Sequence, residues 1–102
     1  MVYLASQLVH MGQRPAPFTM YYTYLLREKI SGRYYIGYSA DLKKRLCEHL
    51  AGTNRSTKYS RNWELVYYEA FLNKFAAIER ERKLKYHGRA LTELKKRIQV
   101  GV

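Results

Sequence analysis

The sequence is poor in cysteine, in acidic residues and in long apolar runs. Cys47 is the only cysteine of the 102 residues, so no intramolecular disulfide can form and a reducing compartment is favoured over secretion. No stretch approaches the roughly 18 apolar residues of a membrane span, and the N-terminus lacks a charged segment followed by a long apolar run. These absences predict a cytoplasmic protein without a membrane partner.

Familiar cofactor motifs are missing as well. The chain has no internal repeat, no P-loop, no paired cysteines for zinc and no dinucleotide fingerprint. Its length suffices for one domain with a small core but leaves no room for a separate recognition module. One domain must therefore carry both binding and any chemistry.

Acidic residues are far outnumbered by basic ones. Eight Asp and Glu stand against nineteen Lys and Arg, which gives a formal net charge of +11 and a pI near 9.9. This balance favours a polyanion, and so nucleic acid, as the partner. The alternative at this point is a basic protein whose charge serves only solubility.

Residues 1–19 differ from the rest in having few charges and the chain breakers Gly12, Pro15 and Pro17. We interpret them as an N-terminal extension, either a mobile segment or a short packing element. Residues 20–102 then form the domain.

Two aromatic-rich segments open this domain. Residues 21–28 and 33–39 have strand composition and are separated by a turn signal at Ser31-Gly32, which predicts an antiparallel hairpin. The two-residue period of strands groups their side chains by face. One face of the first strand carries Tyr22, Tyr24 and Leu26. One face of the second strand carries Tyr35 and Gly37.

The pattern becomes helical after Ser39, which suits an N-cap with Asp41 in the first turn. An apolar stripe recurs at every fourth position and consists of Leu42, Leu46 and Leu50. At about 100° per residue, Arg45 and His49 lie one turn apart on a flank of this stripe. Cys47 is expected as a small residue at the edge of the core and not as a nucleophile, because no base is implied beside it.

A polar loop, residues 51–62, then leads to a third strand at residues 63–71. Trp63 and Leu65 are expected in the core. The basic edge of the loop either contacts a phosphate backbone or is merely solvated, and it consists of Arg55, Lys58 and Arg61.

Residues 74–87 predict a second helix, capped by Asn73 and closed by Gly88. At about 100° per residue, its core-facing stripe consists of Ala77, Ile78, Glu81 and Leu84. Glu79 lies on another flank. An isolated carboxylate on a core-facing stripe is costly unless it is paired or binds a metal. Glu81 is therefore either a metal ligand or the partner of a nearby Lys or Arg.

The segment 89–100 completes the chain with a third helix. Its apolar positions are Leu91, Leu94 and Ile98. Its basic surface, another candidate for nucleic-acid binding, consists of Lys95, Lys96 and Arg97.

In their order along the chain, these features resemble the GIY-YIG endonuclease domain, in particular its short stand-alone bacterial members. Tyr22-Thr23-Tyr24 and Tyr35-Ile36-Gly37, followed by Arg45 and His49, look like its two tripeptides and its helix. The similarity continues downstream, over roughly residues 20–98, with Gly52, Thr57, residues 63–69, Ala77, Glu81, Leu84 and Lys85. Two tripeptides alone are a weak signal, whereas the ordered series is specific.

The pattern and the resemblance together indicate an α/β fold. The expected fold is a small, mainly antiparallel three-stranded sheet flanked by helices, in the order strand, strand, helix, strand, helix, helix. The resemblance implies divalent-metal-dependent hydrolysis of phosphodiester bonds in nucleic acid, with DNA as the first expectation. Glu81 would be the sole direct protein ligand of a Mg²⁺ or Mn²⁺ ion, with water and phosphate oxygens completing the shell.

The resemblance also assigns catalytic roles. Arg45 would bind the scissile phosphate. Tyr35 leads as the group that activates water, with Tyr24 beside it, although a free phenol with a pKa near ~10 needs cationic neighbours to act as a base. His49 would contact phosphate or relay a proton. The alternatives are strand aromatics that only pack on the sheet, and a helix-edge histidine in a local hydrogen bond.

The sequence departs from the family pattern in three places. Tyr22 and Thr23 replace Gly and Ile in the first tripeptide, Tyr38 stands where many repair-type members carry Lys, and the Asn common near the end has no clear counterpart. The missing Lys removes one cation that would depress a tyrosine pKa, which bears on the rate and not on the mechanism.

Two other classes of function stay open on sequence alone. One is a nucleic-acid-binding module without turnover, in which binding is indifferent to metal. The other is a protein-interaction domain that uses the aromatic sheet as its contact surface, which predicts weak salt dependence and no affinity for DNA.

Overall fold

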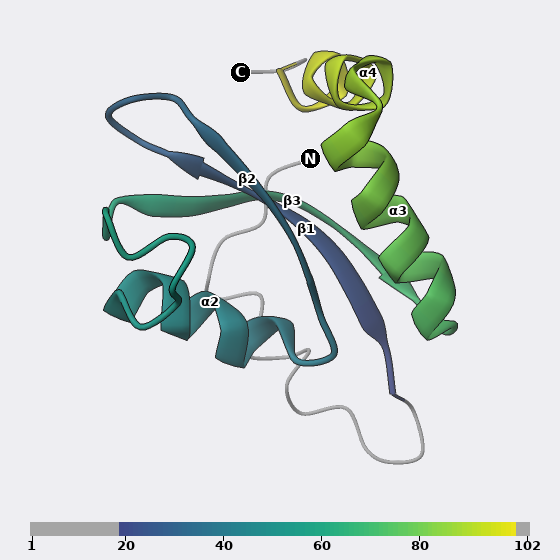
Figure 1. The fold of residues 1–102 in the computed structure, drawn as a ribbon, viewed down its shortest axis with the longest axis horizontal. Coiled ribbons are helices and arrows are strands. Elements are labelled where there is room, and N and C mark those ends of the chain that lie inside the picture. The colour runs from purple at the N-terminus through teal and green to yellow at the C-terminus, as the bar shows by residue number, and fades with distance from the viewer. Residues whose placement is uncertain (1–18, 100–102) are drawn as a thin grey trace.

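The computed structural model describes residues 19–99, which form one sheet with helices on both of its faces (Figure 1). The elements in chain order are β1 (Tyr21–Glu28), β2 (Tyr34–Ser39), α2 (Leu42–Ala51), β3 (Trp63–Phe71), α3 (Lys74–Tyr86) and α4 (Gly88–Gln99). The expected class and element order are confirmed. The N-terminal extension expected at residues 1–19 lies, but for Thr19, outside the described residues.

The sheet has β1 at its centre, antiparallel to both neighbours, in the order β2-β1-β3. Tyr24 in mid-β1 lies opposite Gly37 of β2 and Tyr68 of β3. A register shift between Leu25 and Leu26 marks an irregularity in the pairing with β3. Because β2 is an edge strand, side chains that cross it reach the rim of the sheet.

Each face of the sheet has its own apolar cluster, because side chains alternate along a strand. The face covered by α2 buries Tyr22, Tyr24, Leu26, Leu42, Leu46, Trp63 and Leu65. The face covered by α3 and α4 buries Leu25, Ile36, Val66, Leu84, Leu94 and Ile98. Figure 1 shows α2 on one side of the strands and the other two helices on the opposite side.

Helix α2 begins later than expected. Asp41 and not Ser39 is its N-cap, since the Asp41 carboxylate accepts a hydrogen bond from the backbone N–H of Lys44 at 3.1 Å. The Ser39 hydroxyl instead binds the backbone of Asp41, which tightens the corner between β2 and α2. Gly52, with φ of 75°, ends the helix in the left-handed conformation that favours glycine.

The buried stripe of α2 consists of Leu42, Leu46 and His49. Leu50 is 41% exposed and Cys47 is exposed, so their expected core and core-edge positions were wrong. In a helix with 3.6 residues per turn, a residue seven positions after Leu42 points in nearly the same direction as Leu42, whereas a residue eight positions after it points to the side. The histidine therefore takes the core place that the sequence had given to Leu50.

The junction of the last two helices also differs from expectation. Gly88 begins α4 and does not close α3, which ends at Tyr86; between them His87 donates its N–H to the Lys83 carbonyl at 2.9 Å. Ile78 is exposed and not in the core, so the buried stripe of α3 is narrower than predicted.

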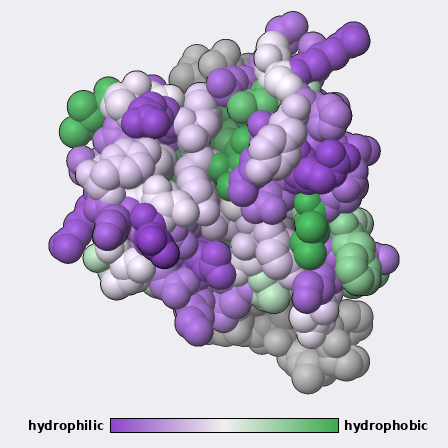
Figure 2. All heavy atoms as spheres, viewed as in Figure 1, coloured by the Kyte–Doolittle hydropathy of each residue, from purple (hydrophilic) through white to green (hydrophobic). Residues whose placement is uncertain are grey.

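The surface in Figure 2 is mainly hydrophilic, with apolar residues in small separate patches. Within residues 19–99, no helix is long and apolar enough to cross a membrane.

Candidate active site

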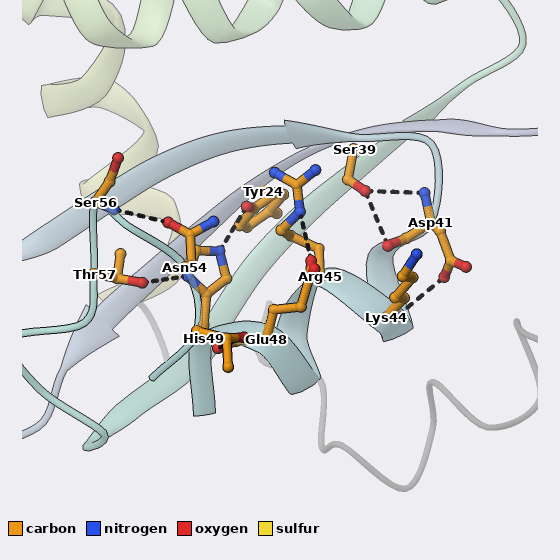
Figure 3. A network of polar contacts seen from close by, with 11 residues as sticks. Tyr24, Ser39, Asp41, Lys44, Arg45, Glu48, His49, Asn54, Ser56 and Thr57 are labelled. Atoms are coloured by element: carbon orange, nitrogen blue, oxygen red, sulfur yellow. Dashed lines mark hydrogen bonds and ion pairs between the residues drawn. The ribbon is translucent and has the colours of Figure 1, made fainter. Parts of the chain in front are cut away.

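Tyr24 lies at the centre of the candidate site. Its ring is almost fully buried and lies over Gly37, where even a methyl group would overlap the phenol. The Tyr24 hydroxyl forms a hydrogen bond of 2.8 Å with Nε2 of His49. Figure 3 shows this hydroxyl between His49 and Arg45, both carried by α2. Glycine at position 37 is thus a steric requirement of the phenol that crosses it.

His49 is completely buried and held at both ring nitrogens. Nδ1 lies 2.6 Å from the hydroxyl of Thr57, and Nε2 faces Tyr24 (Figure 3). Burial and, secondarily, the charge of Arg45 lower the pKa of His49 to about 4. The ring is therefore neutral at pH 7, with one nitrogen donating and the other accepting. The structure places His49 in a buried network with Tyr24 and Thr57.

The phenol of Tyr24 stays protonated. Burial, followed by the proximity of Tyr35, raises its pKa well above the usual value; the charge of Arg45 and a hydrogen bond from it act in the opposite direction. Glu81 also raises the pKa, so this carboxylate of α3 lies within electrostatic reach of the Tyr24 hydroxyl. The charges of Arg45 on α2 and Glu81 on α3 thus both act on the Tyr24 phenol, in opposite directions.

Tyr35 packs beside this network but is only half-buried. Its ring centroid lies 5.1 Å from that of His49 and 6.3 Å from that of Trp63. Among residues 19–99 its hydroxyl has no hydrogen-bond partner, and it is not one of the fully buried polar atoms. The Tyr35 oxygen is consequently the phenol oxygen of the site that is available to water.

Arg45 borders the same network with its side chain 37% exposed. Its Nε lies 3.0 Å from Oε1 of Glu48, one turn further along α2. Exposed ion pairs of this kind are worth less than about 1 kcal/mol. A phosphate oxygen can therefore compete for the guanidinium.

Glu81 lies on α3 with 22% of its side chain exposed, and its Oε2 is 3.3 Å from Nζ of Lys85. The salt bridge that the sequence left as an alternative is thus present. It joins residues one turn apart at a partly open surface, where such pairs contribute about 0.3–0.5 kcal/mol. A pair this weak does not prevent Glu81 from binding a cation.

Two contacts fix α3, and with it Glu81, on the sheet. The buried Thr23 hydroxyl donates to the Ala77 carbonyl at 2.6 Å. On β3, both oxygens of the Glu69 carboxylate accept a hydrogen bond from Nε of Arg80, each at 3.1 Å. Glu79 turns away into an exposed pair with Arg82, whose hydrogen bond lowers the pKa of the Glu79 carboxyl.

The two basic segments expected to bind nucleic acid are not brought together. Arg55, Lys58 and Arg61 lie exposed on the loop that follows α2, on the α2 side of the sheet. The basic residues of α4 lie on the opposite side of the sheet. Nζ of Lys95 lies 4.5 Å from the centroid of the Tyr34 ring, and Lys96 forms an ion pair with Glu93 at 3.5 Å. Arg97 is exposed on the same helix.

Thr57 is a residue of this network to which the sequence alone assigned no role. It is completely buried, holds Nδ1 of His49 and accepts the indole N–H of Trp63 at its backbone carbonyl, 3.0 Å away. A threonine in a polar loop gives no local signal of this position. Its only signal was its place in the family-like series.

Replacing Gly37 with alanine should disturb the site through Tyr24. The new methyl group would overlap the phenol ring, and overpacking of this kind costs roughly 1–3 kcal/mol. Gly88→Ala is the matched control, because nothing lies within 4 Å of the added group there. Denaturant unfolding of both variants checks this. A Gly37→Ala variant as stable as Gly88→Ala would contradict the packing of Tyr24 over β2.

Stability should fall in acid because of His49. As the pH drops from 6.5 to 4, the unfolded chain takes up a proton that the buried imidazole does not accept. The stabilisation is therefore complete above pH 6.5 and declines by about 3 kcal/mol across this window. Denaturant unfolding between pH 7.5 and 4 measures the loss, and His49→Gln should remove this part of the slope. Equal slopes in the two proteins would show that His49 titrates normally.

Two of three comparisons with known proteins found matches. The family model of the GIY-YIG catalytic domain matches residues 20–97. A UPF0213 protein of Streptococcus pyogenes serotype M3 is 43% identical over 65 residues, which cover 63% of this chain and 70% of that protein. A UPF0213 protein of Staphylococcus saprophyticus is 37% identical over 70 residues, 68% of this chain and 84% of that protein. No solved structure matches the chain.

Proposed function

The chain belongs to the GIY-YIG catalytic domain family, a family of nucleases, and from this premise we propose that it is an endonuclease that hydrolyses phosphodiester bonds, with DNA as substrate and a divalent cation as cofactor. We assign the activity to a domain of residues 20–102, with residues 1–19 as an extension. The observation that carries the proposal is the buried Tyr24 phenol, which is hydrogen-bonded to His49 of α2 and whose pKa responds to the charges of both Arg45 and Glu81.

Glu81 supplies the carboxylate that would hold the ion. GIY-YIG nucleases generally depend on a divalent metal. Within residues 19–99 no three His, Cys, Asp or Glu side chains lie together. A single accessible carboxylate fits Mg²⁺ or Mn²⁺, hard cations that are held by one or two carboxylates together with water and phosphate oxygens. When bound, such an ion polarises the phosphodiester and neutralises its developing charge.

Arg45 binds the scissile phosphate in this proposal. Its exposed guanidinium carries donors that Glu48 does not occupy, and such donors stabilise the negative charge that builds up on phosphate oxygens. Its ion pair with Glu48 holds the guanidinium at the edge of the site. Arg45 thereby orients the phosphate next to Tyr35.

Tyr35, as the phenolate, takes the proton from the attacking water, whose oxygen bonds to phosphorus as the bridging P–O bond breaks and the leaving oxygen gains a proton from solvent. Its hydroxyl is the accessible one, whereas Tyr24 is buried and its raised pKa keeps it protonated. The neutral ring of His49 supports both tyrosines, by a hydrogen bond to Tyr24 and by ring contact with Tyr35.

Nucleic-acid contacts are proposed for both basic segments. The loop cations lie on the side of the sheet that carries α2, near the candidate site, and contact the strand that is cut. The α4 cations lie with the opposite face and contact nucleic acid further from the reacting bond. Both sets should make binding fall steeply as salt rises, because phosphate contacts release counterions.

Incubating the protein with end-labelled DNA and RNA tests this function. The panel contains single strands, duplexes, flaps and branches, each with Mg²⁺, Mn²⁺ or EDTA. We expect internal cuts in DNA in the presence of either metal and none in EDTA. Binding without cuts under every condition would favour a module without turnover, and cuts confined to RNA would correct the substrate.

A further inference from the structure

A hollow of about 550 Å³ opens beside the candidate site, where the β1–β2 turn meets the loop between α2 and β3. Its walls carry Arg33 from the turn and Tyr59 and Arg61 from the loop. None of the catalytic roles described above uses these three side chains together. The hollow therefore needs an explanation of its own.

Glu28 fixes the walls of this hollow. Its buried carboxylate accepts hydrogen bonds from the backbone N–H groups of Ile30 and Ser31 on the turn, and from the Ser60 hydroxyl of the loop at 3.3 Å. The backbone N–H of Lys29 also donates to the Asn62 carbonyl at 2.8 Å. These hydrogen bonds hold the turn and the loop together without any ligand. They also occupy the carboxylate of Glu28, which would otherwise repel a phosphate.

Tyr59 presents an open aromatic ring at the hollow. It is 59% exposed, yet its ring packs at 5.6 Å, edge to face, against the buried Trp63. An exposed aromatic held on a buried anchor is the kind of platform on which proteins stack unpaired bases. The guanidinium of Arg33 lies over one face of the Tyr59 ring, 5.5 Å from its centroid, so a base would stack on the other face or on the guanidinium itself.

Arg33 and Arg61 bring positive charge without acidic partners. Both side chains are exposed, and neither forms an ion pair with any residue between 19 and 99. Guanidinium groups bind phosphate in a charge-assisted, often bidentate manner. An exposed aromatic ring and two arginines without ion pairs, all lining one hollow, match the base and the phosphate of one nucleotide.

The hollow lies near the candidate active site, and the buried Trp63 lies between Tyr59 and Tyr35. Trp63 contacts Tyr59 on one side and Tyr35 on the other, with ring centroids 5.6 and 6.3 Å apart. Since nucleotides of a stacked strand follow one another at about 3.4 Å, a base on Tyr59 lies within a few nucleotides of Tyr35. One strand can therefore occupy both places.

We propose that this hollow binds one unpaired nucleotide of the substrate strand, with its base stacked on Tyr59 and its phosphate held by Arg33 and Arg61. The inference rests on the proposed function and names its substrate class, a strand that is single at this position. Single-stranded DNA and RNA share this chemistry. A duplex does not, because its bases remain stacked on each other.

Binding in EDTA, where turnover does not interfere, tests the inference. The probes are a short oligothymidylate, an oligouridylate of equal length and a DNA duplex. Tyr59→Ala should weaken binding of at least one single strand by about tenfold, with little effect on the duplex and no change in salt slope. Tyr59→Phe should bind like wild type. Tyr86→Ala removes a similarly exposed ring from α3 and should change nothing.

The arginines have a different signature. Arg33→Ala and Arg61→Ala should each reduce the slope of log affinity for the single strand against log salt by about 0.7, the value for one lost phosphate contact. Fluorescence of Trp63, the single tryptophan, shows that each variant is folded. Equal losses for single strand and duplex in Tyr59→Ala, or unchanged affinity, would overturn the inference. A protein that binds as predicted but never cuts would refute only the proposed function.

Discussion

Glu81→Gln should reduce metal-stimulated cleavage to background while nucleic-acid binding persists. The substitution keeps the shape of the side chain but removes the charge that a hard divalent cation requires. Binding is expected to stay equal or to tighten, because one negative charge near the phosphates is gone. Cleavage rates over a Mg²⁺ titration, with affinity measured in EDTA, check both parts.

Glu79→Gln is the matched control for this result. It lies on the same helix, and its carboxylate is engaged with Arg82 at an exposed position. Its cleavage should stay close to wild type. If Glu81→Gln cleaves as well as wild type at every metal concentration, Glu81 is not the ligand. If Glu81→Gln unfolds, its pair with Lys85 has a structural role larger than its exposure implies.

Tyr35→Phe should lower the cleavage rate by about 10² or more, with the fold intact. The change deletes the accessible hydroxyl, and the ring keeps its contacts with His49 and Trp63. A loss of this order is typical when a general base is removed. Single-turnover rates separate this loss from weaker binding, and denaturant unfolding should show little change in stability.

Tyr24→Phe serves as the comparison for Tyr35→Phe. It removes a buried hydrogen bond to His49, so it should cost stability of about 1–2 kcal/mol and affect cleavage less. Normal cleavage by Tyr35→Phe together with slow cleavage by Tyr24→Phe would exchange the two roles. Normal cleavage by both variants would rule out a phenol as the base.

The fold followed from the sequence because its signals are local. The alternation in β1 and β2 and the repeat of Leu42 and Leu46 each lie within one element, where side-chain period and structure are directly linked. Caps and helix ends were less accurate, since Ser39 and Gly88 have residue types that suit several neighbouring positions. Local chemistry restricts these boundaries without fixing them.

The site was less accessible to sequence reasoning, because its geometry depends on contacts between distant residues. His49 looked like a polar flank residue, and its burial becomes visible only with Tyr24, 25 positions away, and Thr57 from the following loop. Helical direction did bring Glu81 to notice. It could not show that the charge of this carboxylate acts on the Tyr24 phenol, since that depends on how α3 docks on the sheet.

Reversible control of cleavage by metal is the most direct measurement of the central claim. The protein is mixed with its best labelled substrate and Mg²⁺, the reaction is stopped with EDTA, and excess Mg²⁺ is then added; Glu81→Gln purified in parallel reports any contaminating nuclease. We predict internal cleavage that stops in EDTA and resumes with Mg²⁺ in wild type alone. Cleavage that continues in EDTA, or that is equal in the two proteins, would contradict a metal-dependent site at Glu81.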